Sequence, residues 1–156
     1  MKPHSAAVNG DDRAVVSGGT PPSPVFQLVG ALQAVAHHLE EALEPVGLSL
    51  GKFGVLTRLA DAGEPLPLGT LAERCACVRS NITQLVDRLE AERLVRRVAD
   101  PRDRRFIRAE LTSEGRRRYD DGLRALKATE AALFEHLAGQ DRDELLRLLS
   151  ALKGAC

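Results

Sequence analysis

Aromatic side chains are scarce in this sequence, which has 3% aromatic residues and no tryptophan. Proteins that bind single-stranded nucleic acids or RNA loops stack unpaired bases on aromatic rings. So few rings argue against a binder of that kind and, if a nucleic acid is bound, favour a duplex. Gly-rich phosphate loops, nucleophile elbows and distinctive carboxylate pairs are also missing. We therefore expect neither an enzyme nor a bound cofactor.

Long hydrophobic runs and cysteines are few as well. No apolar run approaches the roughly 18 residues needed to span a bilayer, and no continuous hydrophobic stretch typical of a secretion signal occurs near the start. The three cysteines, Cys75, Cys77 and Cys156, are too few for a disulfide framework. We expect a cytoplasmic protein without a membrane partner.

Net charge is zero, because 22 basic residues balance 22 acidic ones, so any functional charge must lie in its distribution. Residues 71–118 hold 13 basic and 8 acidic side chains, whereas residues 1–70 and 119–156 are both net acidic. The total of 156 residues, 44% of them apolar, suits one globular domain. The basic middle third is the part best suited to an anionic partner.

The beginning of the chain changes character near its first regular apolar pattern. Residues 1–23 are rich in glycine, proline, serine and aspartate, which predicts a disordered tail before a domain over 24–156. From Pro24, apolar residues recur at three- and four-residue spacing until Pro45 and Gly47. This pattern predicts an amphipathic helix of about five turns.

Three further helices are expected in the first two thirds of the chain. One runs from Ser49, a candidate N-cap, to near Gly63. Prolines in "EPLPLGT" then break helicity. Helicity resumes in a short piece over 69–75 and a longer one from about Val78 to Ala91. Two helices separated by so few residues must turn sharply against each other, as in a helix-turn-helix.

A β-hairpin and two more helices complete the predicted order. "LVRRVA" and "FIRAEL" alternate as strands do, with "DPRDRR" at the tip between them. Thr112 is a candidate cap of the next helix, and Asp141 with Glu144 is a candidate capping box for the last one. The predicted fold class is therefore mainly α with a small β-hairpin wing.

A helix-turn-helix followed at once by a basic hairpin is a winged helix, whose second helix fits the DNA major groove while the hairpin reaches the adjacent backbone or minor groove. In that second helix Ile82, Val86 and Leu89 share an apolar face with Leu85. A single arginine here could equally be a solvated surface residue. The inference of DNA binding therefore depends on the coincidence of a helix-turn-helix, a hairpin and a local excess of positive charge. The side chains predicted to contact DNA are Arg79, Ser80, Asn81, Thr83, Gln84 and Arg88 in the helix, and Arg102, Asp103, Arg104 and Arg105 in the wing.

The stretch from 68 to 115 resembles the multiple-antibiotic-resistance regulator (MarR) family of bacterial transcription factors, and the resemblance extends from about Val25 to the C-terminus. Its specific motif is Asp-x-Arg in the wing, then a strand, then Leu-Thr-x-x-Gly. In this sequence the motif is formed by Asp103, Arg105, Leu111, Thr112 and Gly115.

The resemblance implies a homodimer that binds a pseudo-palindromic DNA operator. It assigns residues 24–46 and 117–156 to dimerisation helices and 48–115 to the DNA-binding lobe. It further implies that Arg105 enters the minor groove while Asp103 orients it. The amphipathic first helix and the leucine-rich last one agree, because each has an apolar face to bury.

The sequence departs from the family pattern at three positions. A turn residue that is often Gly is Ala76, and a residue that often caps the second helix is Val78. A residue that is often Gly just after that helix is Arg93. If the backbone there is left-handed, Arg93 costs about 1 kcal/mol relative to Gly.

Cysteines and histidines offer candidate sites apart from DNA. Cys75 and Cys77 form a C-x-C pair that could sense oxidants, although the commonest role of such small side chains is packing. No histidine has a spacing to the pair that would complete a metal site, so no metal is expected. His37, His38 and Phe53 could border a cleft for a small aromatic or phenolic ligand, as in many relatives.

Two functions from different classes follow. The first is a dimeric, sequence-specific regulator of double-stranded DNA, most often a repressor released by a small molecule. The alternative is a winged-helix module whose basic wing meets an acidic protein partner. Steeply salt-dependent binding to a duplex separates the two.

Overall fold

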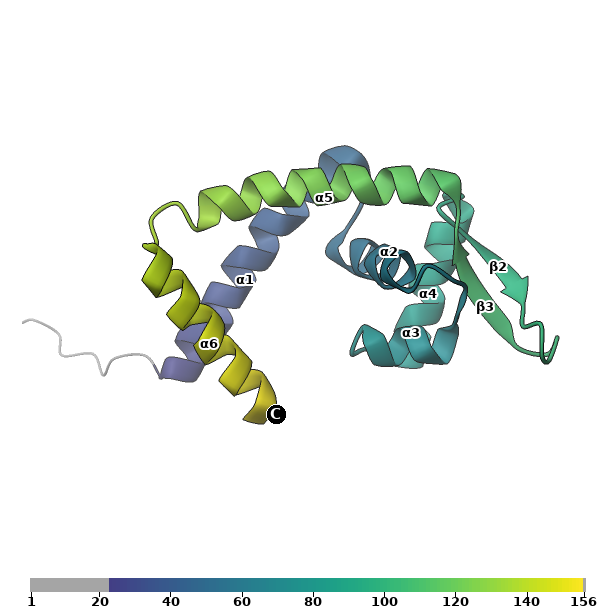
Figure 1. Ribbon diagram of the computed structural model, residues 1–156, viewed down its shortest axis with the longest axis horizontal. Helices are drawn as coiled ribbons and strands as arrows, with labels where there is room; N and C mark the ends of the chain where they lie inside the picture. Colours follow the sequence, from purple (N-terminus) through teal and green to yellow (C-terminus); the bar gives the residue numbers. More distant parts are fainter. Residues whose placement is uncertain (1–22, 156) are drawn as a thin grey trace, which may run out of the picture.

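The computed structural model describes residues 23–155, so the predicted disordered tail lies outside the described residues except for Ser23. Figure 1 shows an arch, in which one long helix lies across the top, a lobe hangs from one end and two helices descend from the other. The elements in chain order are α1 (Pro24–Leu43), the 3-10 turn η1 (Glu44–Val46), α2 (Leu50–Ala62), β1 (Leu66–Pro67), α3 (Leu68–Arg74), α4 (Arg79–Ala91), β2 (Val95–Ala99), β3 (Ile107–Leu111), α5 (Ser113–Leu133) and α6 (Gly139–Ala155).

The hydrophobic core lies in the lobe formed by α2, α3, α4 and the small sheet. Its buried side chains come from the end of α1 to β3, so that three helices and the sheet share one core. Burying each large aliphatic side chain contributes about 1.5–3 kcal/mol to stability. This burial holds the apolar face of α4 against the rest of the lobe. The core residues are Leu43, Leu48, Val55, Leu56, Leu59, Leu66, Leu71, Ala72, Ile82, Val86, Leu89, Leu94, Val95 and Ala109.

Helix ends follow the capping residues predicted from the sequence, with one exception. Ser49 accepts a hydrogen bond from the backbone N–H of Lys52, and α2 ends at Gly63 in a left-handed conformation. The capping box at Asp141 is wrong, because α6 begins at Gly139 and Asp141 already lies in its first turn. Glu144 pairs instead with Arg147, three residues further along the same helix.

The sheet has three antiparallel strands in the order β1-β3-β2, one more than the predicted hairpin. Strand β1 pairs Leu66 with Ala109 and Pro67 with Arg108. It was missed because it is two residues long and its prolines indicate only a break in helicity. Proline is tolerated there because β1 is an edge strand. In the predicted hairpin, β2 pairs with β3 from Val95 opposite Leu111 to Ala99 opposite Ile107.

Helices α1 and α6 leave apolar side chains in solvent. Helix α1 packs against α5, yet of its apolar residues only Leu43 is buried. None of the described helices is both long and apolar enough to cross a membrane. The exposed large apolar residues of α1 are Val25, Phe26, Val29, Leu32 and Val35, and those at and after the end of α5 are Leu137, Leu146, Leu148, Leu149 and Leu152.

Candidate nucleic-acid interface

Helix α4 separates an apolar face from a polar one, as predicted. Ile82, Val86 and Leu89 are fully buried in the lobe, and Leu85 is half-buried beside them. The opposite face is exposed, and the Thr83 hydroxyl donates a hydrogen bond to the Arg79 carbonyl one turn earlier. All six side chains predicted to contact DNA from this helix are exposed, namely Arg79, Ser80, Asn81, Thr83, Gln84 and Arg88.

The turn before α4 shows the effect of the two unusual residues. Ala76 has a positive φ of 50°, and the N–H of Cys77 donates to the carbonyl of Ala72 while that of Ala76 donates to Glu73. This is a Schellman ending of α3, a position that favours glycine. Val78 is the N-cap of α4 and makes no side-chain cap hydrogen bond. The first N–H groups of α4 are thus not capped by a side chain of this residue.

The wing loop is closed at its base by Asp100, which is nearly fully buried. Its carboxylate accepts hydrogen bonds from Arg108 Nε at 2.7 Å and from the backbone N–H of Arg102 at 2.8 Å. Arg108 also donates to the carbonyl of Pro65 beside β1. The hydrogen bond from Arg108, followed by that from Arg102, holds the pKa of the Asp100 carboxyl below its usual range. The loop is therefore anchored to the sheet.

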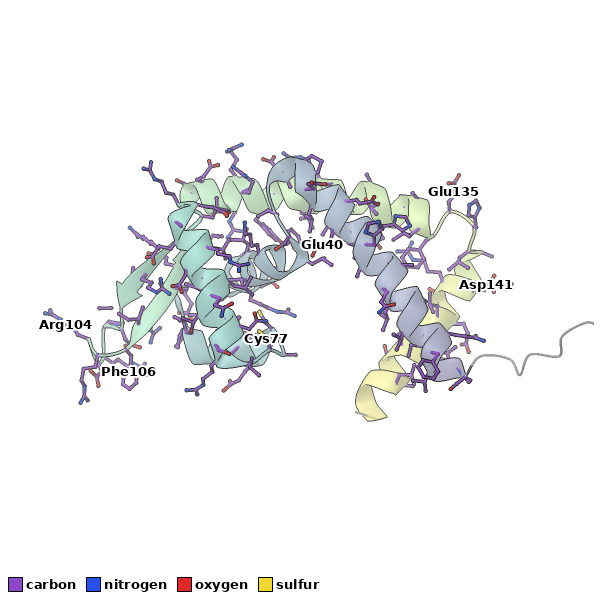
Figure 2. All side chains as sticks on the ribbon, turned by 180° about the vertical axis from the view of Figure 1, so that it is seen from behind. Glu40, Cys77, Arg104, Phe106, Glu135 and Asp141 are labelled. Atoms are coloured by element: carbon purple, nitrogen blue, oxygen red, sulfur yellow. The ribbon has the colours of Figure 1, made fainter. Side chains whose placement is uncertain are left out.

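At the tip of the wing, Asp103 and Arg105 form a pair two residues apart. The Arg105 guanidinium donates to both carboxylate oxygens of Asp103, at 2.7 Å for Nη2 to Oδ2, and the Arg105 backbone N–H donates at 3.0 Å. This contact lowers the pKa of Asp103. Arg102 and Arg104 are exposed, and within residues 23–155 neither forms an ion pair. Figure 2 shows Arg104 directed outward from the tip.

An arginine on β2 connects the wing to α4. Arg97 pairs with Glu90 and Asp87 of α4, and its backbone N–H donates to Glu90 Oε1 at 3.0 Å. On the other side of the same strand, Arg96 pairs with Glu110 directly opposite on β3. The position of the wing relative to α4 is thus set by bonds to the helix itself.

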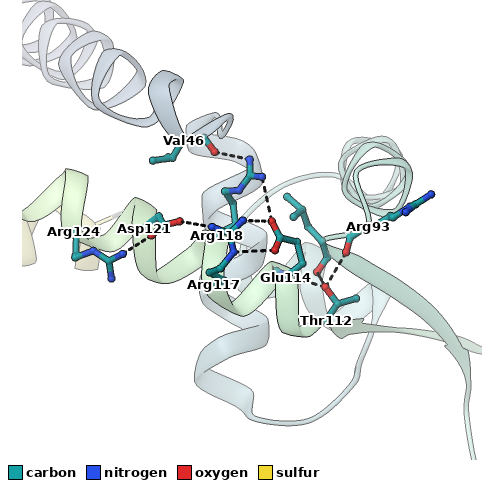
Figure 3. A network of polar contacts seen from close by, with 10 residues as sticks. Val46, Arg93, Thr112, Glu114, Arg117, Arg118, Asp121 and Arg124 are labelled. Atoms are coloured by element: carbon teal, nitrogen blue, oxygen red, sulfur yellow. Dashed lines mark hydrogen bonds and ion pairs between the residues drawn. The ribbon is translucent and has the colours of Figure 1, made fainter.

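Helix α5 begins where α4 and β2 meet, at a joint formed by Arg93, Leu94, Thr112 and Gly115. The Thr112 hydroxyl shares its one proton between the carbonyls of Arg93 and Leu94, at 2.8 and 3.0 Å, and accepts from the N–H of Gly115 (Figure 3). A Cβ on Gly115 would lie 1.9 Å from the Leu94 carbonyl oxygen, so only glycine permits this approach. This explains the Leu-Thr-x-x-Gly motif structurally.

Arg93 has a left-handed backbone, with φ of 61°, so the condition stated for its cost relative to glycine is met. The N–H of Leu94 donates to the carbonyl of Leu89 and that of Arg93 to the carbonyl of Glu90, which is the Schellman pattern at the end of α4.

A further contact joins α5 to η1. Arg118 of α5 donates a hydrogen bond to the Val46 carbonyl at 2.8 Å (Figure 3).

Cys75 and Cys77 lie in the same turn, beside a hollow of about 230 Å³ that Arg58 also lines. Burial raises the pKa of the Cys75 thiol, the neighbouring Cys77 raises it further, and Arg58 opposes both. A raised pKa disfavours the thiolate that reacts with oxidants. The environment of Cys75 therefore does not favour its reaction with oxidants.

Of the three residues predicted to border a ligand cleft, His37 and His38 are neighbours, with ring centroids 6.1 Å apart, whereas Phe53 packs on Tyr119. His38 lines an open groove of about 630 Å³ between α1 and α5, with Ala128 and Leu133 on the opposite wall. His37 is exposed and lies 3.5 Å from Glu41. Phe53 stacks on Tyr119 at 5.5 Å between α2 and α5. His38 alone of the three lies in this groove.

Arg97 and Asp100 hold the wing in place, and neither was predicted from the sequence. A signal existed for Asp100, because aspartate before proline commonly accepts a hydrogen bond from the backbone two residues on. For Arg97 there was none, since its partners are on another element.

A helix-turn-helix with an exposed polar face, joined to an arginine-rich wing, defines a winged-helix DNA-binding protein. The MarR family profile matches residues 46–105. The chain is 32% identical over 117 residues to the HTH-type transcriptional repressor YetL of Bacillus subtilis (strain 168), which covers 74% of this chain and 70% of that protein. The chain belongs to the MarR family and is an HTH transcriptional regulator, which is not a class of enzyme.

Solved structures agree with this assignment. The transcriptional repressor CouR, bound to a 23-mer DNA duplex, matches with a TM-score of 0.78 and 28% identity over 83% of this chain and 92% of that one. CouR from Rhodococcus jostii RHA1, bound to p-coumaroyl-CoA, matches with a TM-score of 0.74 and 29% identity over 87% and 95%. The predicted winged helix-turn-helix fold is confirmed.

Proposed function

We propose that this chain forms a homodimeric repressor that binds a pseudo-palindromic operator and is released from it by a small ligand. The observation that carries the proposal is that the exposed face of α4 and the wing arginines belong to one unit, clamped by Arg97. With α4 in the major groove, the wing reaches the adjacent minor groove. The structure of CouR with a DNA duplex supports this use of the fold.

The residues that we propose to contact DNA fall into those that recognise bases and those that contact the phosphates or the minor groove. Gln84 is exposed near the middle of α4 and can form paired hydrogen bonds to an adenine edge. Arg105, held by Asp103, would enter the minor groove. The remaining predicted contacts, to phosphates and other base edges, are Arg79, Ser80, Asn81, Thr83, Arg88, Arg102 and Arg104.

A second copy of the chain is the partner we propose for the exposed apolar faces of α1 and α6. Ten large apolar side chains are exposed on α1 and over residues 137–152, in the part of the arch away from the lobe (Figure 1). Two copies related by a two-fold axis would bury these faces and present two α4 helices to two half-sites. Analytical ultracentrifugation should give the mass of a dimer, and Leu149→Glu should lower it toward the monomer.

The ligand we propose is a small aromatic or phenolic molecule. The groove between α1 and α5 is lined by alanine and leucine side chains together with the polar residues His38, Glu41 and Thr129, which suits an apolar ring with polar substituents. CouR bound to p-coumaroyl-CoA is a structural relative with an aromatic ligand. Titration of the protein–DNA complex with substituted benzoates and phenols tests release.

Selection from random duplexes tests the DNA part of the proposal. Arg105→Ala should weaken binding to all duplexes and make the salt slope shallower by about one unit, with little change in sequence preference. Gln84→Ala should relax preference at one position in each half-site, at about 1–3 kcal/mol, and leave the salt slope nearly intact. The relaxation must be symmetric, with half-sites about one helical turn apart.

Three results would contradict the assignment. One is loss of sequence preference in the Arg105 variant alone. Another is an asymmetric selected site. The third is the absence of salt-dependent duplex binding by the native protein, which would favour a wing that binds an acidic protein.

A further inference from the structure

Exposed apolar side chains in the described part of the chain fall into two groups. One group lies on α1 and over residues 137–152, where we propose a second copy of the chain. Every other large apolar side chain of the described lobe is at least partly buried, except for Val78, Phe106 and Ile107. These three lie at the N-terminus of α4 and at the wing, on the side proposed to face DNA.

Phe106 is the only aromatic residue of the three, and it is 62% exposed in a loop of charged residues. The loop holds its backbone at both ends. Its N–H donates to the Asp103 carbonyl at 3.0 Å, and its carbonyl accepts from the N–H of Asp100 at 2.9 Å. Figure 2 shows Phe106 close to Arg104 at the tip of the wing. The ring is thus presented to solvent by a fixed backbone.

We propose that Phe106 is an apolar wedge, which the wing inserts into the minor groove of the bound duplex beside Arg105. The proposal rests on the proposed function, since it requires the wing to reach the minor groove. The charge of the wing indicates what the ring meets, because the exposed Arg102, Arg104 and Arg105 precede Phe106 in the same loop and match a phosphate-lined groove. Phenylalanine is among the side chains that minor-groove binders insert between base steps.

Such a wedge reads the duplex by its deformability. Inserting a ring partly unstacks one base step and bends the DNA toward the major groove. Pyrimidine–purine steps such as TA and CA unstack most easily, whereas A-tracts are stiff. Phe106 therefore makes the chain prefer a flexible step beneath each wing, at a position where no side chain has to form a hydrogen bond with a base.

The test compares native protein with Phe106→Ala and Phe106→Leu in selection from random duplexes, followed by affinity measurements on the native site. Phe106→Ala should lose the enrichment of pyrimidine–purine steps under the wing and bind that site about 10-fold or more weakly. Its salt slope should equal that of native protein, because no charge is lost. Phe106→Leu keeps an apolar wedge and should retain the step preference.

A fluorescent base reports the unstacking directly. With 2-aminopurine at the flexible step, native protein and Phe106→Leu should raise the fluorescence, and Phe106→Ala should not. Because the ring is exposed, all variants should melt at the native temperature.

Equal site selection and affinities within about twofold for native protein and Phe106→Ala would overturn the wedge while leaving operator binding intact. A change in the oligomeric state of the DNA-free protein in Phe106→Ala would also overturn the wedge, since the ring would then contact a second protein chain. If native protein binds no duplex, the proposed function itself fails.

Discussion

Replacing Arg93 by glycine tests whether the end of α4 stores backbone strain. Arg93 has a φ of 61°, in the left-handed region, where a residue with a Cβ costs about 1–2 kcal/mol. Glycine removes that cost but loses about 0.5–1 kcal/mol through the greater freedom of the unfolded chain. Its Schellman hydrogen bonds use only backbone atoms and remain. Arg93→Gly should therefore raise the free energy of unfolding by up to about 1 kcal/mol.

Arg93→Ala is the matched control, because it removes the same charge but keeps the Cβ. An arginine near a helix C-terminus contributes about 0.3–1 kcal/mol through the helix dipole, which both variants lose. The glycine variant should then exceed the alanine variant by about 1 kcal/mol, equivalent to about 2–4 °C in Tm for a chain of this size. Urea unfolding at fixed protein concentration and in about 0.5 M salt measures the difference with the charge effect screened.

Equal stability of the glycine and alanine variants would refute the reasoning, since it would mean that the strain relieved by glycine does not exceed the loss from the freer unfolded chain. The operator should not change in either variant. Ala76→Gly offers an independent repeat at the end of α3, where φ is 50° and no charge is involved. The Ala76→Gly variant should also be more stable than the native protein, by up to about 1 kcal/mol.

Three other perturbations address the joint, the cysteines and the wing. Gly115→Ala should lower the free energy of unfolding, measured by urea titration, by about 3 kcal/mol or more, because the alanine Cβ would overlap a backbone carbonyl. Gly54→Ala is the control: its Cβ would meet open space, so the same titration should show an unchanged or higher stability. Peroxide should affect operator binding equally in native protein and in a Cys75→Ser, Cys77→Ser double variant, and protection of the double variant alone would restore a redox role. The pKa of Asp100 is lower in the folded protein than its unfolded value of about 3.9, so the ionised carboxylate stabilises the fold at pH values above that unfolded pKa. This contribution is lost as the pH falls through the folded pKa. The stability difference between native protein and Asp100→Asn, measured by urea unfolding at a series of pH values, should shrink below about pH 4, and a constant difference would contradict it.

The order of helices could be predicted because local signals marked most boundaries. Ser49, Gly63 and Thr112 are capping or terminating residues whose effect depends on the immediate backbone alone. The apolar period of α4 identified its buried face for the same reason. At Asp141 a similar signal misled, because α6 starts two residues earlier at Gly139.

Features that depend on distant partners could not be predicted. Strand β1 is two residues long and exists only because Leu66 meets Ala109 on β3. The clamp at Arg97 joins residues that are 7 and 10 positions apart on a helix and a strand. In the same way, the stacking of Phe53 on Tyr119, 66 positions later in the chain, could not be predicted. Each of these contacts is set by how the elements pack, which no local pattern records.

The direct backbone contact at Gly115 has a mechanical consequence for regulation. No side chain separates the start of α5 from the Leu94 carbonyl, so no rotamer change can absorb a displacement there. We therefore expect the lobe and the first turns of α5 to move as one rigid body. Helix α5 has 21 residues and a length of about 31 Å, so a ligand that tilted it by about 5° at its far end would swing the lobe by about 3 Å. In the proposed dimer, this geometry would translate a change of angle among the dimerisation helices into a change in the spacing between the two α4 helices.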